Sequence, residues 1–230
     1  MSKKIVFLNY PLSADDPNPP AIPQPEFTPF MSMAKGKEAN VTMIKVVSHT
    51  GSHVDAPCHV IEGGITITDF RAEEFMFDCP VVFDLPLKDE QIVMPDDLAQ
   101  FVEKGKQADL LLFRFGYGPI RRSDPLRYSQ KSPGFGIESA MYLLENFPNM
   151  RCVGMDVPSL ACIAALDKTM KAHNVLLAGN GGRFLVIEDM NLDQDLKGLR
   201  RVILAPWFIK NLDGGPATIF GEIVQPENNL

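Results

Sequence analysis

Apolar and polar residues follow one another along the chain in short blocks that predict strands and helices in turn. Helices are predicted over 95–105, where Pro95 and two acids begin the pattern and Gly105 ends it, and over 137–147, which Pro148 ends. The segment 109–115 is a near-continuous apolar run, which is typical of a buried strand. Further strands are predicted at 41–47, 80–85, 151–155, 202–205 and 217–224. Strands and helices mixed in this way give an α/β or α+β fold, and we predict a single α/β domain over residues 1–230.

The region before the first of these strands is rich in proline from Pro11 to Pro29. Proline is excluded from helix interiors and central strands, so residues 11–40 are predicted to form an extended arm or a loop beside the substrate. Phe27 and Phe30 lie near the end of this region and would gain from burial. Their rings could stack on an aromatic substrate, or they could make core or dimer contacts.

Composition and charge exclude several classes of partner. The chain has 230 residues, of which 45% are hydrophobic and 22% charged, as expected for a globular protein. Its 22 basic and 29 acidic residues give a net charge of −7, which disfavours both nucleic acid and an anionic membrane surface as partners. No apolar run reaches the roughly 18 to 20 residues that span a bilayer, and the N-terminal one is too short for a signal peptide. We therefore expect a cytoplasmic protein with four reduced cysteines.

Three of the four histidines lie within one eleven-residue segment, His49 to His59, which also contains Asp55. On a helix, Asp55 would point about 200° away from His53, and Pro57 would break the helix. On an extended chain, the side chains of His53 and Asp55 point the same way, about 7 Å apart at the backbone. A bend at Gly51 would bring in His49. The segment therefore predicts a kinked strand or loop on which these three groups hold one metal ion, since imidazole and carboxylate suit Zn²⁺, Mn²⁺ or Fe²⁺.

The fourth histidine, His173, and Glu188 are weaker candidates. Glu188 ends an apolar run, where a carboxylate is unexpected unless another group receives it. Taken alone, His173 is as compatible with an ordinary surface position as with a metal site. Glu188 is likewise as compatible with a solvated strand end as with a role in the site.

The segment from His49 to His59 strongly resembles the His-x-Gly-Thr-His-x-Asp-x-Pro-x-His signature of the cyclase family, which includes bacterial kynurenine formamidase and isatin hydrolase. Similar stretches follow in the family's order at 132–135, 154–159, 173–177, 188–192 and 213–217. The resemblance implies a mixed β-sheet flanked by helices, of the swivelling β/β/α type, and a homodimer or homotetramer. The interval from His173 to Glu188 is about three residues longer than the family pattern.

The resemblance also implies a site. His49, His53 and Asp55 would hold a divalent metal, Zn or Mn. His59 would be a proton carrier or a ligand of a second ion, and His173 and Glu188 would complete a site for one or two ions per chain.

The function that this resemblance implies is hydrolysis of a carbon–nitrogen amide bond by metal-activated water. The small-molecule substrate would be an aryl formamide such as N-formylkynurenine, or a cyclic amide such as isatin. Arg114, Arg121 or Arg122 could meet a substrate carboxylate, although exposed arginines are seldom so specific. A lactone hydrolase, a cyclising dehydratase and a metal-binding protein without catalysis are the alternatives.

Overall fold

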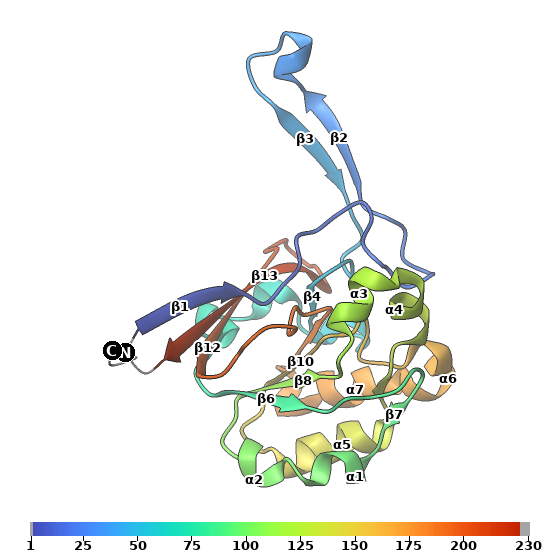
Figure 1. Ribbon diagram of the computed structural model, residues 1–230, viewed down its shortest axis with the longest axis vertical. Helices are drawn as coiled ribbons and strands as arrows, with labels where there is room; N and C mark the ends of the chain where they lie inside the picture. Colours follow the sequence, from blue (N-terminus) through green and yellow to red (C-terminus); the bar gives the residue numbers. More distant parts are fainter. Residues whose placement is uncertain (1, 226–230) are drawn as a thin grey trace.

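A mixed sheet of nine strands, curved until it is nearly closed, forms the centre of the computed structural model, which describes residues 2–225 (Figure 1). The strands pair in the order β5, β12, β13, β4, β11, β10, β8, β6, and β1 pairs with β13. Their bounds are β1 Ser2–Phe7, β4 His53–Asp55, β5 Met76–Phe77, β6 Pro80–Asp84, β8 Leu110–Arg114, β10 Cys152–Met155, β11 Leu185–Glu188, β12 Leu199–Pro206 and β13 Gly214–Gln225.

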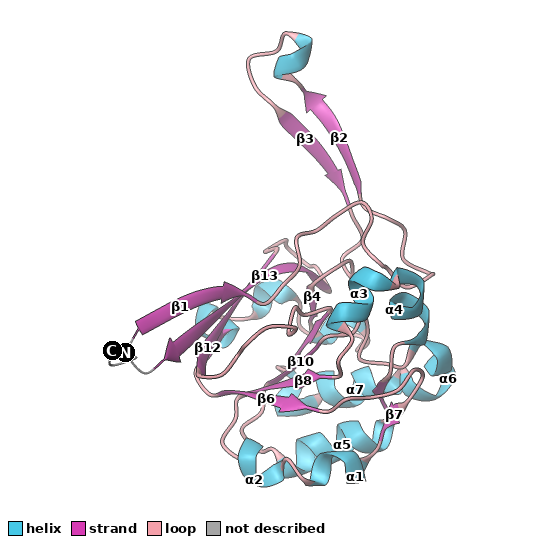
Figure 2. Cartoon of the chain, in the orientation of Figure 1, coloured by secondary structure: helices cyan, strands magenta, loops and turns pink. Residues whose placement is uncertain are grey.

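Short helices flank this sheet (Figure 2). They are α1 Pro95–Ala99, α2 Val102–Gly105, α3 Gly118–Ser123, α4 Pro125–Lys131, α5 Ile137–Asn146, α6 Leu166–Thr169, α7 Lys171–Leu177 and α8 Gly179–Gly182. Two two-stranded sheets lie apart from the main one, formed by β7 (Ile92–Val93) with β9 (Gly134–Phe135) and by β2 (Glu26–Met31) with β3 (Val41–Lys45). The predicted single-domain α/β fold, with a mixed sheet flanked by helices, is confirmed.

The sheet joins a parallel half to an antiparallel half at β4. Strands β6, β8, β10 and β11 run parallel to one another, whereas β4 is antiparallel to both β11 and β13. The long strand β13 pairs with β4 over 214–216 and with β12 over 217–223. Strand β4 therefore lies at the centre of the sheet, where both halves meet.

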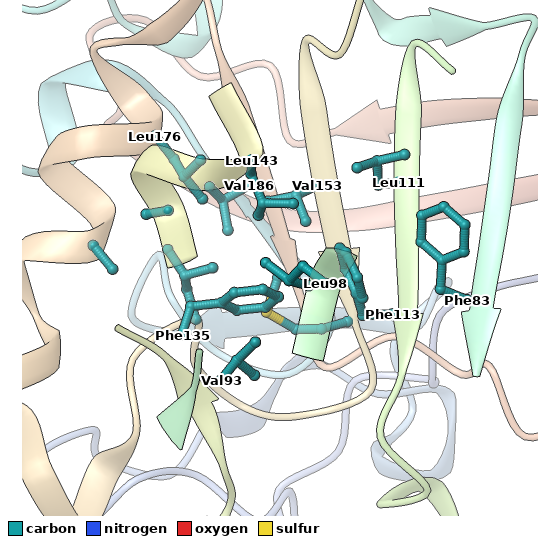
Figure 3. Packing of buried hydrophobic residues seen from close by; sticks show 14 of the residues in the cluster. Phe83, Val93, Leu98, Leu111, Phe113, Phe135, Leu143, Val153, Leu176 and Val186 are labelled. Atoms are coloured by element: carbon teal, nitrogen blue, oxygen red, sulfur yellow. The ribbon is translucent and has the colours of Figure 1, made fainter. Parts of the chain in front are cut away.

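The parallel half is buried on both faces, which explains its apolar sequence. Leu111 and Phe113 of β8 pack on one face against Leu143 of α5 and Leu176 of α7 (Figure 3). Leu110 and Leu112 point to the other face, into a second apolar cluster inside the curved sheet. A strand with two buried faces needs apolar residues at every position, as the run at 109–115 predicted.

Two predictions from the sequence are wrong in part. The predicted helix over 95–105 is two short helices, α1 and α2, and at the break between them Phe101 stacks on Phe83 with ring centres 4.5 Å apart. The proline-rich region was expected to stay outside any sheet up to Pro29, yet β2 includes Pro29, opposite Thr42 of β3. Proline is tolerated there because a two-stranded sheet has only edge strands.

The β2–β3 hairpin projects away from the body of the molecule (Figure 1). Every residue of β3, and all of β2 except Met31, is exposed. The hairpin and its tip carry six large apolar side chains in solvent: Phe27, Phe30, Met33, Val41, Met43 and Ile44. Among the described residues 2–225 as a whole, no helix has the length and apolar character needed to cross a membrane.

Candidate metal centre

Strand β4 supplies the two central groups of the site, His53 and Asp55, which point to the same side of the strand. Both residues are almost completely buried, with exposed fractions of 2% and 1%. In register, His53 lies opposite Glu188 at the end of β11, and Asp55 lies opposite Gly214 at the start of β13. The position of β4 between these two strands thus brings chemically active residues from distant parts of the sequence together.

His49 reaches the same site from the loop before β4. Gly51 has a left-handed backbone (φ 61°), so the bend predicted there is present. The His49 ring lies with Nδ1 2.8 Å from Asp55 Oδ1 and Nε2 2.8 Å from Asp213 Oδ2. The bend thus places the His49 ring against Asp55.

Glu188 and His173 complete the buried part of the cluster. Glu188 Oε2 lies 3.1 Å from His53 Nε2, and Glu188 Oε1 lies 3.1 Å from His173 Nε2 on α7. The Leu160 amide also donates to Glu188 Oε1, at 2.6 Å. Both residues are buried, so the surface position for His173 and the solvated strand end for Glu188 are wrong.

The long interval between these two residues is taken up by a tight turn. After α7, Asn180, Gly181 and Gly182 adopt left-handed backbone conformations, with φ of 50°, 65° and 76°. Glycine adopts this conformation at little cost, and asparagine tolerates it better than most other residues. The extra residues therefore form a turn at the surface and leave His173 beside Glu188.

His59 lies at the more open side of the cluster, on the 3₁₀ turn Pro57–His59. One fifth of its side chain is exposed, and its Nδ1 atom lies 3.7 Å from Asp213 Oδ2. Its ring centre is 4.0 Å from that of His49 and 5.8 Å from that of His173. The six residues proposed from the sequence as ligands or proton carrier are thus gathered in one place.

Asp213 is a member of this cluster that the sequence did not assign. It immediately precedes β13, and its Oδ2 atom contacts His49 at 2.8 Å and approaches His59. The stretch 213–217 resembles the cyclase family and begins with Asp213, so it could have pointed to this residue. The resemblance was not used to assign Asp213 a role.

The charges within the cluster reinforce one another. Burial by itself would lower the pKa of His49, but hydrogen bonds to Asp213 and Asp55 outweigh it and raise the pKa to about 10. The hydrogen bond from His49, followed by that from His59, holds the pKa of Asp213 well below its usual range. Burial alone would raise the pKa of Glu188, but His173 and His53 outweigh it and lower the pKa. These contacts favour ionised acids facing a protonated His49, and metal binding would release its proton because a histidine ligand must be neutral.

The donor atoms fit a divalent metal ion. His53 donates from Nδ1 to the Gly51 carbonyl at 2.7 Å, because a carbonyl can only accept, and this leaves Nε2 facing the cluster. That Nε2 atom and Asp55 Oδ2 are buried and make no well-aligned hydrogen bond, although Nε2 lies 3.1 Å from Glu188 Oε2. Three overlapping sets have ligand atoms within 4.8 Å of one another: His49, His53 and Asp55; Asp55, His59 and His173; His49, His59 and Asp213. Buried, unpaired lone pairs are costly, and a cation would satisfy them.

The three arginines considered as possible partners of a substrate carboxylate contact acids of the chain itself. Arg114 pairs with Asp84, and Arg122 pairs with Asp193. Arg121 is buried between Asp16 and Asp189. Each of the three therefore has an acidic partner within the chain, as is usual for such arginines.

Within a single chain, the aromatic residues proposed for substrate binding do not reach the metal centre. Phe27 and Phe30 are on β2 of the projecting hairpin, and both rings are exposed. An earlier part of the proline-rich region does reach the site: Pro17, Asn18 and Pro19 line a cavity of about 10 Å³ beside His49 and His53. A cavity of that size holds about one water molecule.

The chain is similar to known proteins in sequence and in fold. Residues 6–161 match the family model described as "Putative cyclase". The kynurenine formamidase of Bacillus cereus is 25% identical over 197 residues, which cover 84% of this chain and 87% of that protein. Cyclase-like protein 3 of Oryza sativa subsp. japonica is 26% identical over 189 residues, 80% of this chain and 66% of that protein, so the chain spans about two thirds of its length. The solved isatin hydrolase A of Labrenzia aggregata shares the fold, with a TM-score of 0.80 over 97% of this chain and 94% of that chain at 22% identity.

The fold and the cluster together define an α/β protein with a buried histidine–carboxylate centre suited to a divalent metal. The family model matches well over half of the chain. The chain belongs to the cyclase family.

Proposed function

We propose that this protein is a metal-dependent hydrolase that cleaves a carbon–nitrogen amide bond in a small molecule, either an aryl formamide or a cyclic amide. The observation that carries this proposal is the convergence of four histidines and three carboxylates, in which the buried atoms His53 Nε2 and Asp55 Oδ2 make no well-aligned hydrogen bond. The kynurenine formamidase and isatin hydrolase relatives support amides as the substrate class.

In this proposal, His49, His53 and Asp55 hold the first divalent ion. Asp55 also faces His173, whose Nε2 atom lies 3.8 Å from Asp55 Oδ2, so His173 and Glu188 would hold a second ion beside the first. Zinc and manganese both suit this donor set, with one or two ions per chain. When bound, such an ion polarises the scissile carbonyl and makes water a stronger acid.

His59 is the proposed proton carrier. Its ring is less buried than that of His53 or His173, and its Nδ1 atom lies 3.7 Å from Asp213 Oδ2, whose carboxylate can orient the ring. In the hydrolysis, the oxygen of water bonds to the carbonyl carbon and the carbon–nitrogen bond breaks. His59 accepts a proton from the water and delivers it to the departing nitrogen, which leaves a carboxylic acid and an amine.

We also propose that the chain works as a homodimer or homotetramer, with the β2–β3 hairpin docked on a second copy. A two-stranded hairpin is at best marginally stable alone in water, and this one exposes apolar side chains on both strands. The body of the molecule carries an apolar hollow of about 340 Å³, lined by residues that include Phe70, Phe75 and Phe208. In such an assembly, Phe27 and Phe30 would be buried against the partner.

A substrate panel tests the proposed reaction. The protein, supplied with Zn²⁺ or Mn²⁺, is assayed with N-formylkynurenine, isatin, a simple lactone and a hydroxy acid able to cyclise. We expect turnover of one of the two amides, and loss of that turnover in His53→Ala. Turnover of the lactone or the hydroxy acid alone would identify a lactone hydrolase or a cyclising dehydratase. Metal binding with no turnover of any substrate would favour a non-catalytic metal-binding protein.

A further inference from the structure

Arg121, on α3, is the centre of a buried ion network next to the metal centre. Its Nε and Nη2 atoms donate to the two carboxylate oxygens of Asp189, both at 2.7 Å. The same Nη2 atom also donates to Asp16 Oδ1, at 2.8 Å. The guanidinium also lies 4.1 Å from the centre of the Tyr10 ring. Its side chain is 9% exposed, and both acids are more deeply buried. Such a planar, two-pronged contact fixes direction as well as charge.

The first partner, Asp189, ties the end of β11 to neighbouring elements. Asp189 directly follows Glu188 and has a left-handed backbone (φ 53°), which is uncommon outside glycine. Its carbonyl accepts from Ser52 Oγ at 2.5 Å, and its carboxylate accepts from the Tyr128 hydroxyl at 2.5 Å. Ser52 is the residue before His53. Asp189 therefore connects Glu188, at the end of β11, to the start of β4.

The second partner, Asp16, lies next to residues that line the cavity. Asp16 immediately precedes Pro17, Asn18 and Pro19, which line the small cavity beside His49 and His53. It also packs on the bend before β4, because a Cβ atom at Gly51 would lie only 3.1 Å from Asp16 Oδ2. One guanidinium thus joins the wall of the cavity to the turn that follows Glu188.

We infer that Arg121 is a positioning residue for the metal centre: by holding Asp189 and Asp16 together, it sets the direction of Glu188 and keeps residues 16–19 against His49 and His53. This inference rests on the proposed metal-dependent function. Without the guanidinium, the two buried carboxylates would lose their shared cation and would repel each other. The turn after Glu188 and the wall of the cavity would then separate.

Metal affinity and spectroscopy of Arg121→Met test this role separately from activity. Cobalt is titrated into the metal-free protein, because its visible spectrum reports ligand geometry, and kcat and KM are measured with the preferred amide. We expect a cobalt affinity about 10–100-fold lower than in wild type, the range typical of groups that orient metal ligands, together with an altered spectrum. Arg121→Lys should restore part of the affinity. The matched control is Arg122→Met on the same helix, whose arginine is exposed and contacts Asp193, and it should stay within about twofold of wild type.

Two further variants keep the inference testable if Arg121→Met does not fold. Tyr128→Phe removes one hydrogen bond from Asp189 and should lower cobalt affinity several-fold, whereas Asp16→Asn loosens only the cavity wall and should change KM more than cobalt affinity. Wild-type affinity and spectrum in Arg121→Met, or in both Arg121→Lys and Tyr128→Phe, would overturn the role of Arg121. A wild-type protein that binds no cobalt would instead overturn the proposed function.

Discussion

Gly214 is the position where the packing around the metal centre is tightest, and alanine there should damage both the fold and the site. Gly214 begins β13 and pairs with Asp55 of β4. A Cβ atom at this position would lie 2.3 Å from the Val54 carbonyl oxygen, 3.2 Å from Asp55 Cα and 3.3 Å from His49 Cε1. The Val54 oxygen belongs to the backbone, so no side-chain rotation can relieve the clash.

The size of the effect follows from these distances. A carbon and an oxygen in non-bonded contact lie about 3.3 Å apart, so β13 and β4 must separate by about 1 Å. Overpacking of this kind costs about 1–3 kcal/mol, and up to about 1 kcal/mol is regained because alanine restricts the unfolded chain. We expect a net loss of about 1.5 kcal/mol, equivalent to a Tm lower by about 3–6 °C in a chain of this length.

The assay compares Gly214→Ala with Gly215→Ala, the matched neighbour. A Cβ atom at Gly215 would meet Leu212 Cδ2 at 3.3 Å and Trp207 Cβ at 3.7 Å, and the leucine can rotate away. Urea unfolding of the metal-free proteins gives the free energy of unfolding, and zinc titration against a competing chelator gives affinity. Gly215→Ala should stay within about 0.5 kcal/mol of wild type. Equal stability and equal zinc affinity in the two variants would refute the reasoning.

Three further predictions concern the proton carrier, a surface ion pair and metal removal. His59→Gln should retain its metal and lose about 10²- to 10⁴-fold in kcat, whereas full activity would remove His59 from the mechanism. The Arg183 guanidinium contacts both carboxylate oxygens of Glu74 and holds its pKa at about 2, below its usual 4.5. The pair therefore stabilises the fold above about pH 4.5 and loses this contribution as the pH falls toward 2, so Glu74→Gln should cost about 1–2 kcal/mol in urea unfolding at pH 7 and little at pH 2. Metal at one hundred times its Kd should stabilise wild type by about 2.7 kcal/mol over chelated protein in thermal unfolding, and an equal gain in Asp55→Asn would contradict the assigned ligand.

Much of the fold could be predicted where burial imposes a local pattern. Strand β8 was found because both of its faces are covered, which requires an unbroken apolar run. Strand β1 carries no such pattern, since most of its residues are exposed and backbone pairing with β13 holds it in place. Strand β3 was predicted, but its place in a projecting hairpin was not, because a strand's own sequence does not specify its partner.

In the site, too, local patterns were predictable and contacts between distant segments were not. His49, His53 and Asp55 lie so close in sequence that spacing and one glycine bend suffice to bring them together. Asp213 comes from the far end of the chain and reaches them only because β13 pairs with β4. No local pattern contains that pairing, so geometry within a single segment could not reveal it.

Metal content is the most direct test of the central claim that this cluster holds a divalent ion. The protein is purified without chelator and without a histidine tag, and metal per chain is measured for wild type and Asp55→Ala. We predict about one or two ions per wild-type chain and their loss in the variant. A wild-type chain that holds no metal, even after Zn²⁺ or Mn²⁺ is added, would contradict the account.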